Sequence, residues 1–376
     1  MRLLSFILAL FLALFPLFSL SASGEIETEA RSVILMEAQS GRVLYEENAD
    51  EPLPPASVTK IMTLLLVMEA LDSGRITLED AVTVSERAAS MGGSQVYLEP
   101  GEQMTVDEMI KCVVVASAND AAAALAEHVA GSLEGFVDAM NRRASELSMS
   151  ATHFENTNGL DDTTKNHVTS ARDIAIMSRE LLKYDKILEY TCIWTDTVRN
   201  GAFGLTNTNK LIRFYKGANG LKTGFTSSAG YCISATAKRD GMQLIAVVMA
   251  SPTSDQRNKT AVHLLDYGFA NYEIFNAASP QQRTLPVSAG KEEVVALRYE
   301  DFSALLEKGQ GKKVELTVEL PEKLVAPVAE GQKVGRVIFS IDGRELGSAG
   351  IFAEQSVERL SVLDLFLKLF NFFVLF

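Results

Sequence analysis

Short apolar runs bounded by turn residues occur in two distant parts of the chain and predict β-strands there. The runs comprise residues 32–36, 42–45, 221–225, 231–236 and 244–249. Gln39-Ser40-Gly41 separates the first two runs and Asp240-Gly241 separates the last two, as expected for hairpin turns. We therefore expect a hairpin near the N-terminus and a group of strands after Gly220.

Apolar residues at helical spacing predict helices before and after the second group of strands. One helix runs from Ala56 to Leu71 and ends at Asp72-Ser73-Gly74, and another spans residues 261–269. Residues 105–128 form a further helical region, interrupted near residues 117–120 before a run of alanines that suits close helix packing. Beyond about Phe275 the pattern changes to short alternating strands separated by turns, which predicts a small all-β domain without a catalytic motif.

Both ends of the chain are strongly apolar. Arg2, the apolar run from Leu3 to Leu20 and the small residues that follow are typical of a secretory signal peptide, with cleavage near residue 23. At the other end, residues 361–376 are almost all Leu, Phe or Val. The exceptions are Ser361, Asp364, Lys368 and Asn371, which form one polar stripe at helical spacing. Glu354 and Glu358 continue this spacing towards the N-terminus. A helix of this length reaches about 24 Å, less than the roughly 30 Å of a hydrocarbon core, so we expect it to lie in the membrane surface.

Composition narrows the possible functions. The net charge of −13 argues against nucleic acid as a partner. The three cysteines, Cys112, Cys192 and Cys232, are too few for a disulfide framework, and none of the four histidines shows the spacing of a metal site. We therefore expect no metal and no cofactor, and a fold that depends on its apolar core.

Three short motifs carry the candidate chemistry: Ser57-Val58-Thr59-Lys60, Ser117-Ala118-Asn119 and Lys222-Thr223-Gly224. Their first residues are 60 and then 105 positions apart (117 − 57 and 222 − 117). On a helix Ser57 and Lys60 share a face, close enough for the amine to take the hydroxyl proton that a serine nucleophile must lose. A second SxxK sequence, at residues 288–291, lies where no helical pattern exists, so we interpret it as coincidental.

With their flanking residues, these motifs resemble the signature of low-molecular-weight penicillin-binding proteins, the serine-type D-alanyl-D-alanine carboxypeptidase family. The resemblance covers nearly the whole chain. It implies an α/β (α+β) fold: a β-lactamase/transpeptidase-like catalytic domain with an antiparallel sheet and a helical subdomain, then a small all-β domain and a C-terminal amphipathic helix. The ranges we expect are a signal peptide at 1–23, the catalytic domain at 24–275, the β domain at 276–352 and the anchor helix at 353–376.

The resemblance also implies roles for individual residues. Ser57 is the acylated nucleophile, Lys60 its base, and Ser117 a relay of the proton to the leaving D-alanine. The residues implied in substrate binding are Asn119, Lys222, Thr223, Gly224, Phe225 and Arg257, although an ordinary surface position is an equal alternative for Arg257. The backbone N–H groups of Ser57 and Phe225 are the implied oxyanion hole. The family usually has histidine at the position of Asn158 and aspartate at that of Asn219, departures that bear on substrate preference.

The expected function is removal of the terminal D-alanine from peptidoglycan stem pentapeptides through an acyl-enzyme on Ser57, in cell-wall maturation. β-Lactam antibiotics are expected as covalent inhibitors, and the protein is expected on the outer face of the cytoplasmic membrane, held there by its C-terminal helix. One alternative is a β-lactamase-like hydrolase, for which we find no convincing Glu-x-x-x-Asn segment. The other is a non-catalytic wall-binding scaffold, which would have no need of an intact Ser57 and Lys60.

Overall fold

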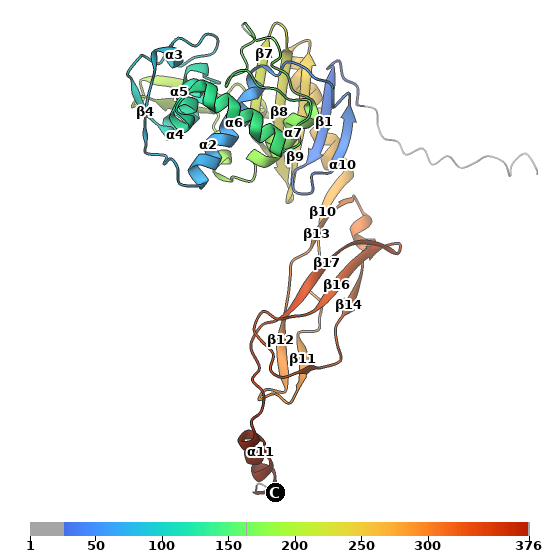
Figure 1. The fold of residues 1–376 in the computed structure, drawn as a ribbon. Coiled ribbons are helices and arrows are strands. Elements are labelled where there is room, and N and C mark those ends of the chain that lie inside the picture. Colours follow the sequence, from blue (N-terminus) through green and yellow to red (C-terminus); the bar gives the residue numbers. More distant parts are fainter. Residues whose placement is uncertain (1–25, 163, 375–376) are drawn as a thin grey trace, which may run out of the picture.

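The structure is a computed structural model that describes residues 26–162 and 164–374. The expected signal peptide lies outside these residues. Figure 1 shows three parts in chain order: an N-terminal domain of sheet and helices, an elongated β domain, and a terminal helix at the far end of the β domain.

A five-stranded antiparallel sheet forms the centre of the N-terminal domain, in the strand order β2-β1-β9-β8-β7. The strands are β1 (Ser32–Glu37), β2 (Val43–Glu47), β7 (Ala218–Thr226), β8 (Gly230–Arg239) and β9 (Met242–Ser251). The predicted N-terminal hairpin therefore joins the sheet through β9, the strand latest in the sequence. This order leaves β7 at one edge of the sheet.

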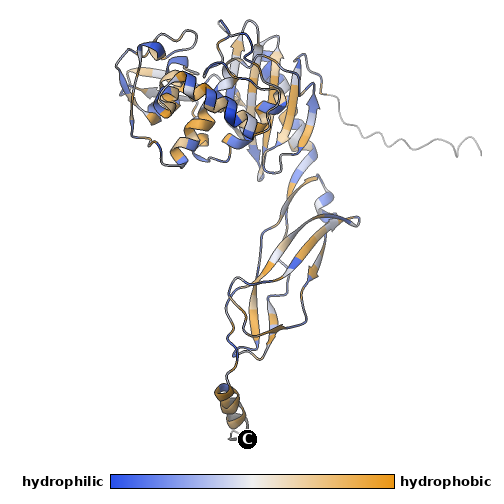
Figure 2. Ribbon diagram, viewed as in Figure 1, coloured by the Kyte–Doolittle hydropathy of each residue, from blue (hydrophilic) through white to orange (hydrophobic). Residues whose placement is uncertain are grey.

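Both faces of this sheet are buried because helices cover each of them. In β1, Ile34 and Met36 point into one apolar core, and Val33 and Leu35 point into the other. Helix α7 (Ala171–Leu181) packs on the first face, and α10 (Ser254–Asn271) packs on the second. The strands are consequently apolar on both sides, as their colouring in Figure 2 shows.

A helical subdomain and two short strand pairs lie beside the sheet. The helices are η1 (Ala56–Thr59), α2 (Lys60–Asp72), α3 (Glu86–Ala89), α4 (Val106–Val115), α5 (Asn119–Ala130), α6 (Leu133–Glu146), α8 (Lys186–Thr191) and α9 (Leu211–Phe214). The strand pairs are β3 (Ala81–Thr83) with β4 (Gln103–Thr105), and β5 (Thr195–Val198) with β6 (Phe203–Thr206). The predicted interruption near residue 117 separates α4 from α5, and the alanines of α5 are buried between its neighbours.

The β domain begins directly after α10. Its strands are β10 (Tyr272–Asn276), β11 (Thr284–Ser288), β12 (Val294–Tyr299), β13 (Ser303–Glu307), β14 (Glu315–Glu319), β15 (Leu324–Val325), β16 (Lys333–Ile341) and β17 (Arg344–Ala353), with η2 at Gln310–Lys313. Six of them form a sheet in the order β14-β16-β17-β12-β11-β15, and β10 pairs with β13. Strand β10 thus crosses the expected domain boundary at residue 275.

The C-terminal helix is shorter than expected. Helix α11 spans Val362–Val374, so it starts nine residues after the expected start at 353 (362 − 353). The preceding residues complete the β domain instead, because Val357 is 1% exposed in its core and pairs with Val328. Glu354 and Glu358, expected on the polar stripe, lie in this non-helical segment. Within the part of the chain that the structure describes, no helix has the length and apolarity needed to cross a membrane.

Candidate active site

The three sequence motifs meet at the β7 edge of the sheet. Ser57 lies in η1, Asn119 begins α5, and Lys222 lies on β7, which packs against η1. Gly224 makes this approach possible, since it faces the backbone of η1 at a distance that leaves no room for a side chain. The motif residues are therefore brought together by three different elements.

Lys60 is at the centre of the site. Its side chain is fully buried, and its amine lies 2.9 Å from the Ser57 hydroxyl oxygen. The same amine donates hydrogen bonds to the Asn119 side-chain oxygen at 2.6 Å and to the Asn158 carbonyl at 2.8 Å. These two acceptors hold the amine against the nucleophile in one orientation.

The surroundings of Lys60 favour its neutral form. Burial, and secondly the Lys222 cation, lower the pKa of Lys60 well below its usual range, while the Asp120 carboxylate acts in the opposite direction. Asp120 is itself buried and accepts hydrogen bonds from the Val96 and Leu98 backbone. A neutral amine 2.9 Å from a serine hydroxyl can act as its general base.

Lys222 and Arg257 form a pair of buried cations. They are 1% and 6% exposed, and among the described residues neither has a carboxylate partner. Burial, and then the Arg257 charge, lowers the pKa of Lys222 to about 7, and burial lowers the pKa of Arg257 to about 10. Because buried charges are costly without a counter-ion, this corner is suited to an anionic ligand. Of the two interpretations of Arg257, the structure excludes an ordinary surface position.

Ser117 lies in the turn between α4 and α5, and Asn119 is the first residue of α5. Ser117 is 4% exposed and has φ = 61°, a left-handed conformation that is uncommon for residues other than glycine. No hydrogen bond joins its hydroxyl to Ser57, Lys60 or Lys222, all of which the structure describes. Asn119 in contrast contacts Lys60 directly, and its amide nitrogen donates to the Gly92 carbonyl at 2.7 Å.

The remaining predicted binding residues lie along β7. The Thr223 hydroxyl donates to the Thr208 hydroxyl at 2.7 Å, a partner that no sequence motif indicated. The Phe225 side chain is 54% exposed and stacks on Tyr231, with 4.3 Å between ring centroids. Phe225 thus presents an aromatic surface to solvent at the end of the same strand that carries Lys222.

Two further residues near Lys60 were missed by the sequence interpretation. His167 contacts the Thr59 hydroxyl at 2.8 Å through Nε2. Its Nδ1 accepts from the Glu155 backbone N–H, so the proton of the neutral ring is on Nε2. Asn158 contributes its backbone carbonyl, which a sequence motif based on side chains does not reveal. The neighbouring Gly159 is the local sequence feature that marks this close approach of the backbone. It has φ = 84°, and a Cβ there would lie 1.8 Å from the Ala56 carbonyl oxygen.

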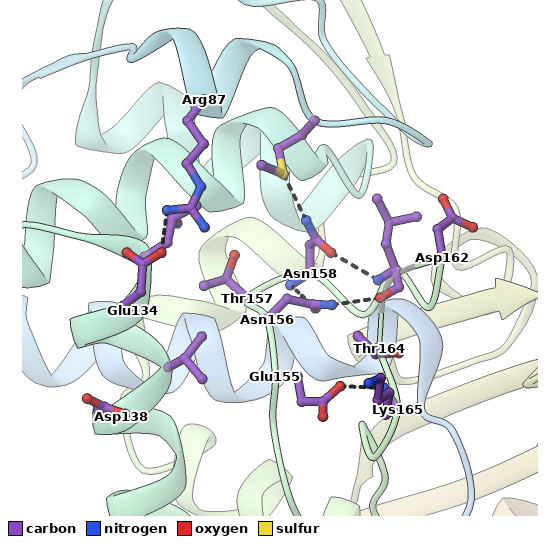
Figure 3. A pocket seen from close by; sticks show the side chains of 14 residues that line it. Arg87, Glu134, Asp138, Glu155, Asn156, Thr157, Asn158, Asp162, Thr164 and Lys165 are labelled. Atoms are coloured by element: carbon purple, nitrogen blue, oxygen red, sulfur yellow. Dashed lines mark hydrogen bonds and ion pairs between the residues drawn. The ribbon is translucent and has the colours of Figure 1, made fainter.

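A groove of about 600 Å³ opens on the other side of Asn158 (Figure 3). It lies between α3, α6 and the segment 155–165, and the Arg87–Glu134 ion pair stands at its wall. The Asn158 side chain donates to the Met91 sulfur and accepts from the Leu160 backbone. In the described part of the chain none of the three motifs lines this groove, but Asn158 belongs to both places, since it lines the groove and its carbonyl accepts from the Lys60 amine.

Comparisons with known proteins place the chain in a family. A family model described as D-alanyl-D-alanine carboxypeptidase matches residues 19–253, and one described as the C-terminal domain of penicillin-binding protein 5 matches residues 269–359. D-alanyl-D-alanine carboxypeptidase DacF of Bacillus subtilis is 42% identical over 353 residues, covering 92% of this chain and 90% of that protein. DacC of Escherichia coli, of the same description, is 36% identical over 362 residues, covering 93% and 90%.

Solved structures show the same similarity. Penicillin-binding protein PBP3 of Streptococcus pneumoniae, a peptidoglycan synthesis regulatory factor, superposes with a TM-score of 0.73 at 30% identity, over 88% of this chain and all of that one (100%). Penicillin-binding protein 5 of Haemophilus influenzae gives a TM-score of 0.70 at 33% identity, over 89% and 98%. Because the first family model covers more than half of the chain and the relatives align along nearly all of it, the chain belongs to the D-alanyl-D-alanine carboxypeptidase family and is a serine peptidase of the bacterial cell wall.

Proposed function

We propose that Ser57 is the residue acylated in this carboxypeptidase and that Lys60 is its base. The observation that carries the proposal is the contact of the buried Lys60 amine with the Ser57 hydroxyl, 2.9 Å long, in surroundings that favour the neutral amine. Lys60 takes the hydroxyl proton as the Ser57 oxygen attacks the carbonyl carbon between the two D-alanines. The tetrahedral intermediate places its negative charge near the backbone N–H groups of Ser57 and Phe225.

The intermediate then collapses and the peptide C–N bond breaks. The leaving amine needs a proton, and Ser117, in the turn that also carries Asn119, is our candidate to relay it from Lys60. D-Alanine departs and leaves an ester on Ser57. Water then attacks this ester and Lys60 accepts one water proton, which it passes to the Ser57 oxygen as the ester C–O bond breaks. The shortened stem peptide loses its remaining proton to solvent and leaves as a carboxylate, and Ser57 and the neutral Lys60 are restored.

Recognition of the terminal carboxylate is assigned to Lys222, Thr223 and Arg257. The two cations are buried, and no described carboxylate neutralises them, so a bound carboxylate lowers the free energy of both. Asn119 remains the candidate for hydrogen bonding to the substrate amide, because one N–H of its side chain is not used by Gly92. A β-lactam is expected to acylate Ser57 as an inhibitor, with its carboxylate bound in the same place. A relative from Listeria monocytogenes, penicillin-binding protein D2, has been solved in an ampicillin-bound form.

We also propose that the enzyme is exported and held at the membrane surface by α11. The support is the apolar surface of this helix, whose described side chains include Val362 at 88% and Phe366 at 63% exposure. The carboxylate of Asp364 accepts two hydrogen bonds from Ser361 at the start of the helix. The other two expected stripe residues, Lys368 and Asn371, have side chains outside the described part of the structure.

The experiment is mass spectrometry of the full-length protein after incubation with penicillin, combined with D-alanine release from a pentapeptide. We expect one penicilloyl adduct per chain on Ser57 and none on Ser288, the serine of the coincidental SxxK sequence. Turnover is expected for the pentapeptide free acid and to be much lower for its C-terminal amide. An adduct on another serine, or equal rates on acid and amide, contradicts the proposed roles.

A further inference from the structure

Arg199 is linked to the active site through the loop of residues 92–98, to which its side chain is hydrogen-bonded. The residue lies at the tip of the β5–β6 hairpin, and its guanidinium spans both oxygens of Glu102 at 2.7 and 2.9 Å. The same group donates to the backbone carbonyls of Val96 at 2.8 Å and Tyr97 at 3.0 Å. One side chain therefore ties three elements together: the hairpin, the loop of residues 92–98 and the segment before β4.

The clamped loop is in direct contact with the residues around Lys60. The Ser94 carbonyl accepts from the Asn119 backbone N–H at 2.7 Å, and the Gly92 carbonyl accepts from its side chain at 2.7 Å. The N–H groups of Val96 and Leu98 in turn donate to the buried Asp120 carboxylate. The loop thus fixes Asn119, which holds the Lys60 amine, and Asp120, which acts on its charge.

The loop and the hairpin tip are strained where they meet. Tyr97 has φ = 56° with its side chain 71% exposed, and Arg199 has φ = 55°. Bulky residues rarely adopt this conformation, and it persists only where the surroundings hold it. Arginine is also an unusual choice for this turn, because residues such as asparagine and glycine fit positive φ better.

We propose that Arg199 is a positioning residue for acylation: by clamping the 92–98 loop it holds Asn119, and through Asn119 the Lys60 amine, against Ser57. The proposal rests on the roles proposed above for Ser57 and Lys60. Among the described residues, Arg199 bonds to Glu102, Val96 and Tyr97 and makes no hydrogen bond to Ser57, Lys60 or Asn119. Arg199 determines how much of the time Asn119, Lys60 and Ser57 are aligned. Its loss therefore lowers the acylation rate constant more than the affinity for the β-lactam or peptide.

The test is Arg199→Asn, because asparagine suits the turn and removes only the clamp. Stopped-flow acylation by a chromogenic β-lactam, measured to saturation, gives the dissociation constant and the acylation rate constant separately. Misplacement of reacting groups by about 1 Å can reduce a rate by about a hundredfold, and we expect a loss of about tenfold to a hundredfold in the rate constant, with a dissociation constant changed less than about threefold. Arg199→Lys, which keeps one donor group, is expected to recover part of the rate.

Arg143→Gln is the matched control. Arg143 also joins several elements through carboxylates, with Glu69 at 2.8 Å, and its side chain is 24% exposed compared with 25% for Arg199. Its partners lie away from the 92–98 loop, so this variant is expected to lose stability and keep the acylation rate. Equal acylation rates in wild type and Arg199→Asn, or equal losses in Arg199→Asn and Arg143→Gln, overturn the proposal. If instead the wild-type protein is not acylated on Ser57, the proposed function fails before Arg199 is in question.

Discussion

A Cβ added at Gly224 would lie 2.9 Å from the backbone nitrogen of Ser57 and 3.0 Å from the Pro55 oxygen. Both are main-chain atoms of the segment that carries the nucleophile, and neither can move without changing the position of Ser57. The KTG glycine is therefore a condition for the approach of β7 to η1.

We expect Gly224→Ala to reduce acylation by at least about tenfold, because β7 and η1 must separate to accept the methyl group. Gly204→Ala is the control, since Gly204 is also in a strand and has open space around its Cβ position. Rates of penicillin acylation in the two variants, with thermal unfolding recorded alongside, check the prediction. An acylation rate in Gly224→Ala equal to that of the control would falsify the geometric role of this glycine.

Lys60→Arg is expected to abolish acylation while the protein stays folded. The guanidinium keeps a positive charge but does not give up its proton, so it cannot serve as the base. The adduct on Ser57, counted by mass spectrometry after a long incubation, is the measurement. Lys186→Arg, at a half-buried position on α8 whose amine pairs with Glu189, is the control for the same chemical change. Acylation of Lys60→Arg at a rate close to wild type shows that another group takes the serine proton.

The pH dependence of kcat/KM follows from the two lysines. As pH rises, Lys60 loses its proton and activity increases. Burial and the Lys222 cation hold the pKa of Lys60 well below its usual range, so the neutral base is available without strongly alkaline conditions. As pH rises through about 7, Lys222 loses its charge in the free enzyme and the attraction for the substrate carboxylate weakens. A bell-shaped profile is therefore expected for a pentapeptide free acid. The Lys222→Arg variant keeps its charge at higher pH, so the alkaline limb of its kcat/KM profile is expected to move to higher pH. An alkaline limb at the wild-type pH shows that a group other than Lys222 is titrating.

His167 gives the stability of the N-terminal domain a separate pH dependence. Burial lowers the pKa of His167 to about 4, below the usual 6.5, so the unfolded state binds more protons than the folded state between these values. The contribution to stability is complete above pH 6.5 and is lost as pH falls to about 4. At about 1.36 kcal/mol per pKa unit the total is about 3 kcal/mol.

Urea unfolding at several pH values between 4 and 7 measures this effect. His167→Gln, which keeps a donor and an acceptor, is expected to flatten the dependence in this window. His263→Gln, at an exposed position on α10, is expected to leave it unchanged. A wild-type protein whose unfolding midpoint does not fall with pH in this window contradicts the assignment.

Much of this molecule could be predicted from its sequence, for identifiable reasons. The family, fold class and activity followed from three motifs, and the comparisons confirm them. The short apolar runs and the turn at Asp240-Gly241 predicted β8 and β9, because these strands are adjacent in sequence and paired through a short turn. The interruption at Ser117 was also visible, since it breaks the helical spacing.

The features that were missed depend on contacts between distant segments. The carbonyl of Asn158 reaches Lys60 from 98 positions away, and a backbone group leaves no pattern in side-chain types. His167 and Thr208 were unremarkable in sequence because their partners, Thr59 and Thr223, are brought to them only by the fold. The start of α11 was placed too early, because Glu354 and Glu358 continue a helical spacing while the buried Val357 between them keeps the chain in the β domain.

The membrane anchor can be separated from the chemistry by truncation after Ser361. This cut removes α11 and spares Val357 and the Leu360 N–H, which bonds to the Ala289 carbonyl within the β domain. Helix α11 lies at the far end of the β domain from the active site (Figure 1), so the shortened protein is expected to be soluble and to release D-alanine at the full-length rate. Insertion of each large apolar side chain into lipid contributes roughly 1.5–3 kcal/mol before ordering costs, and the loss of several together explains the release.

Phe366→Asp together with Phe370→Asp tests the same surface in the full chain. The two rings stack on one another with centroids 6.3 Å apart, and both are more than half exposed, at 63% and 54%. Two charges on this face are expected to abolish flotation with anionic lipid vesicles, while Asp364→Asn, a change at the start of the polar stripe, is expected to float like the wild type. A double variant that still floats removes the support for α11 as the anchor. A truncated protein that loses its peptidase activity shows instead that α11 is part of the folded enzyme.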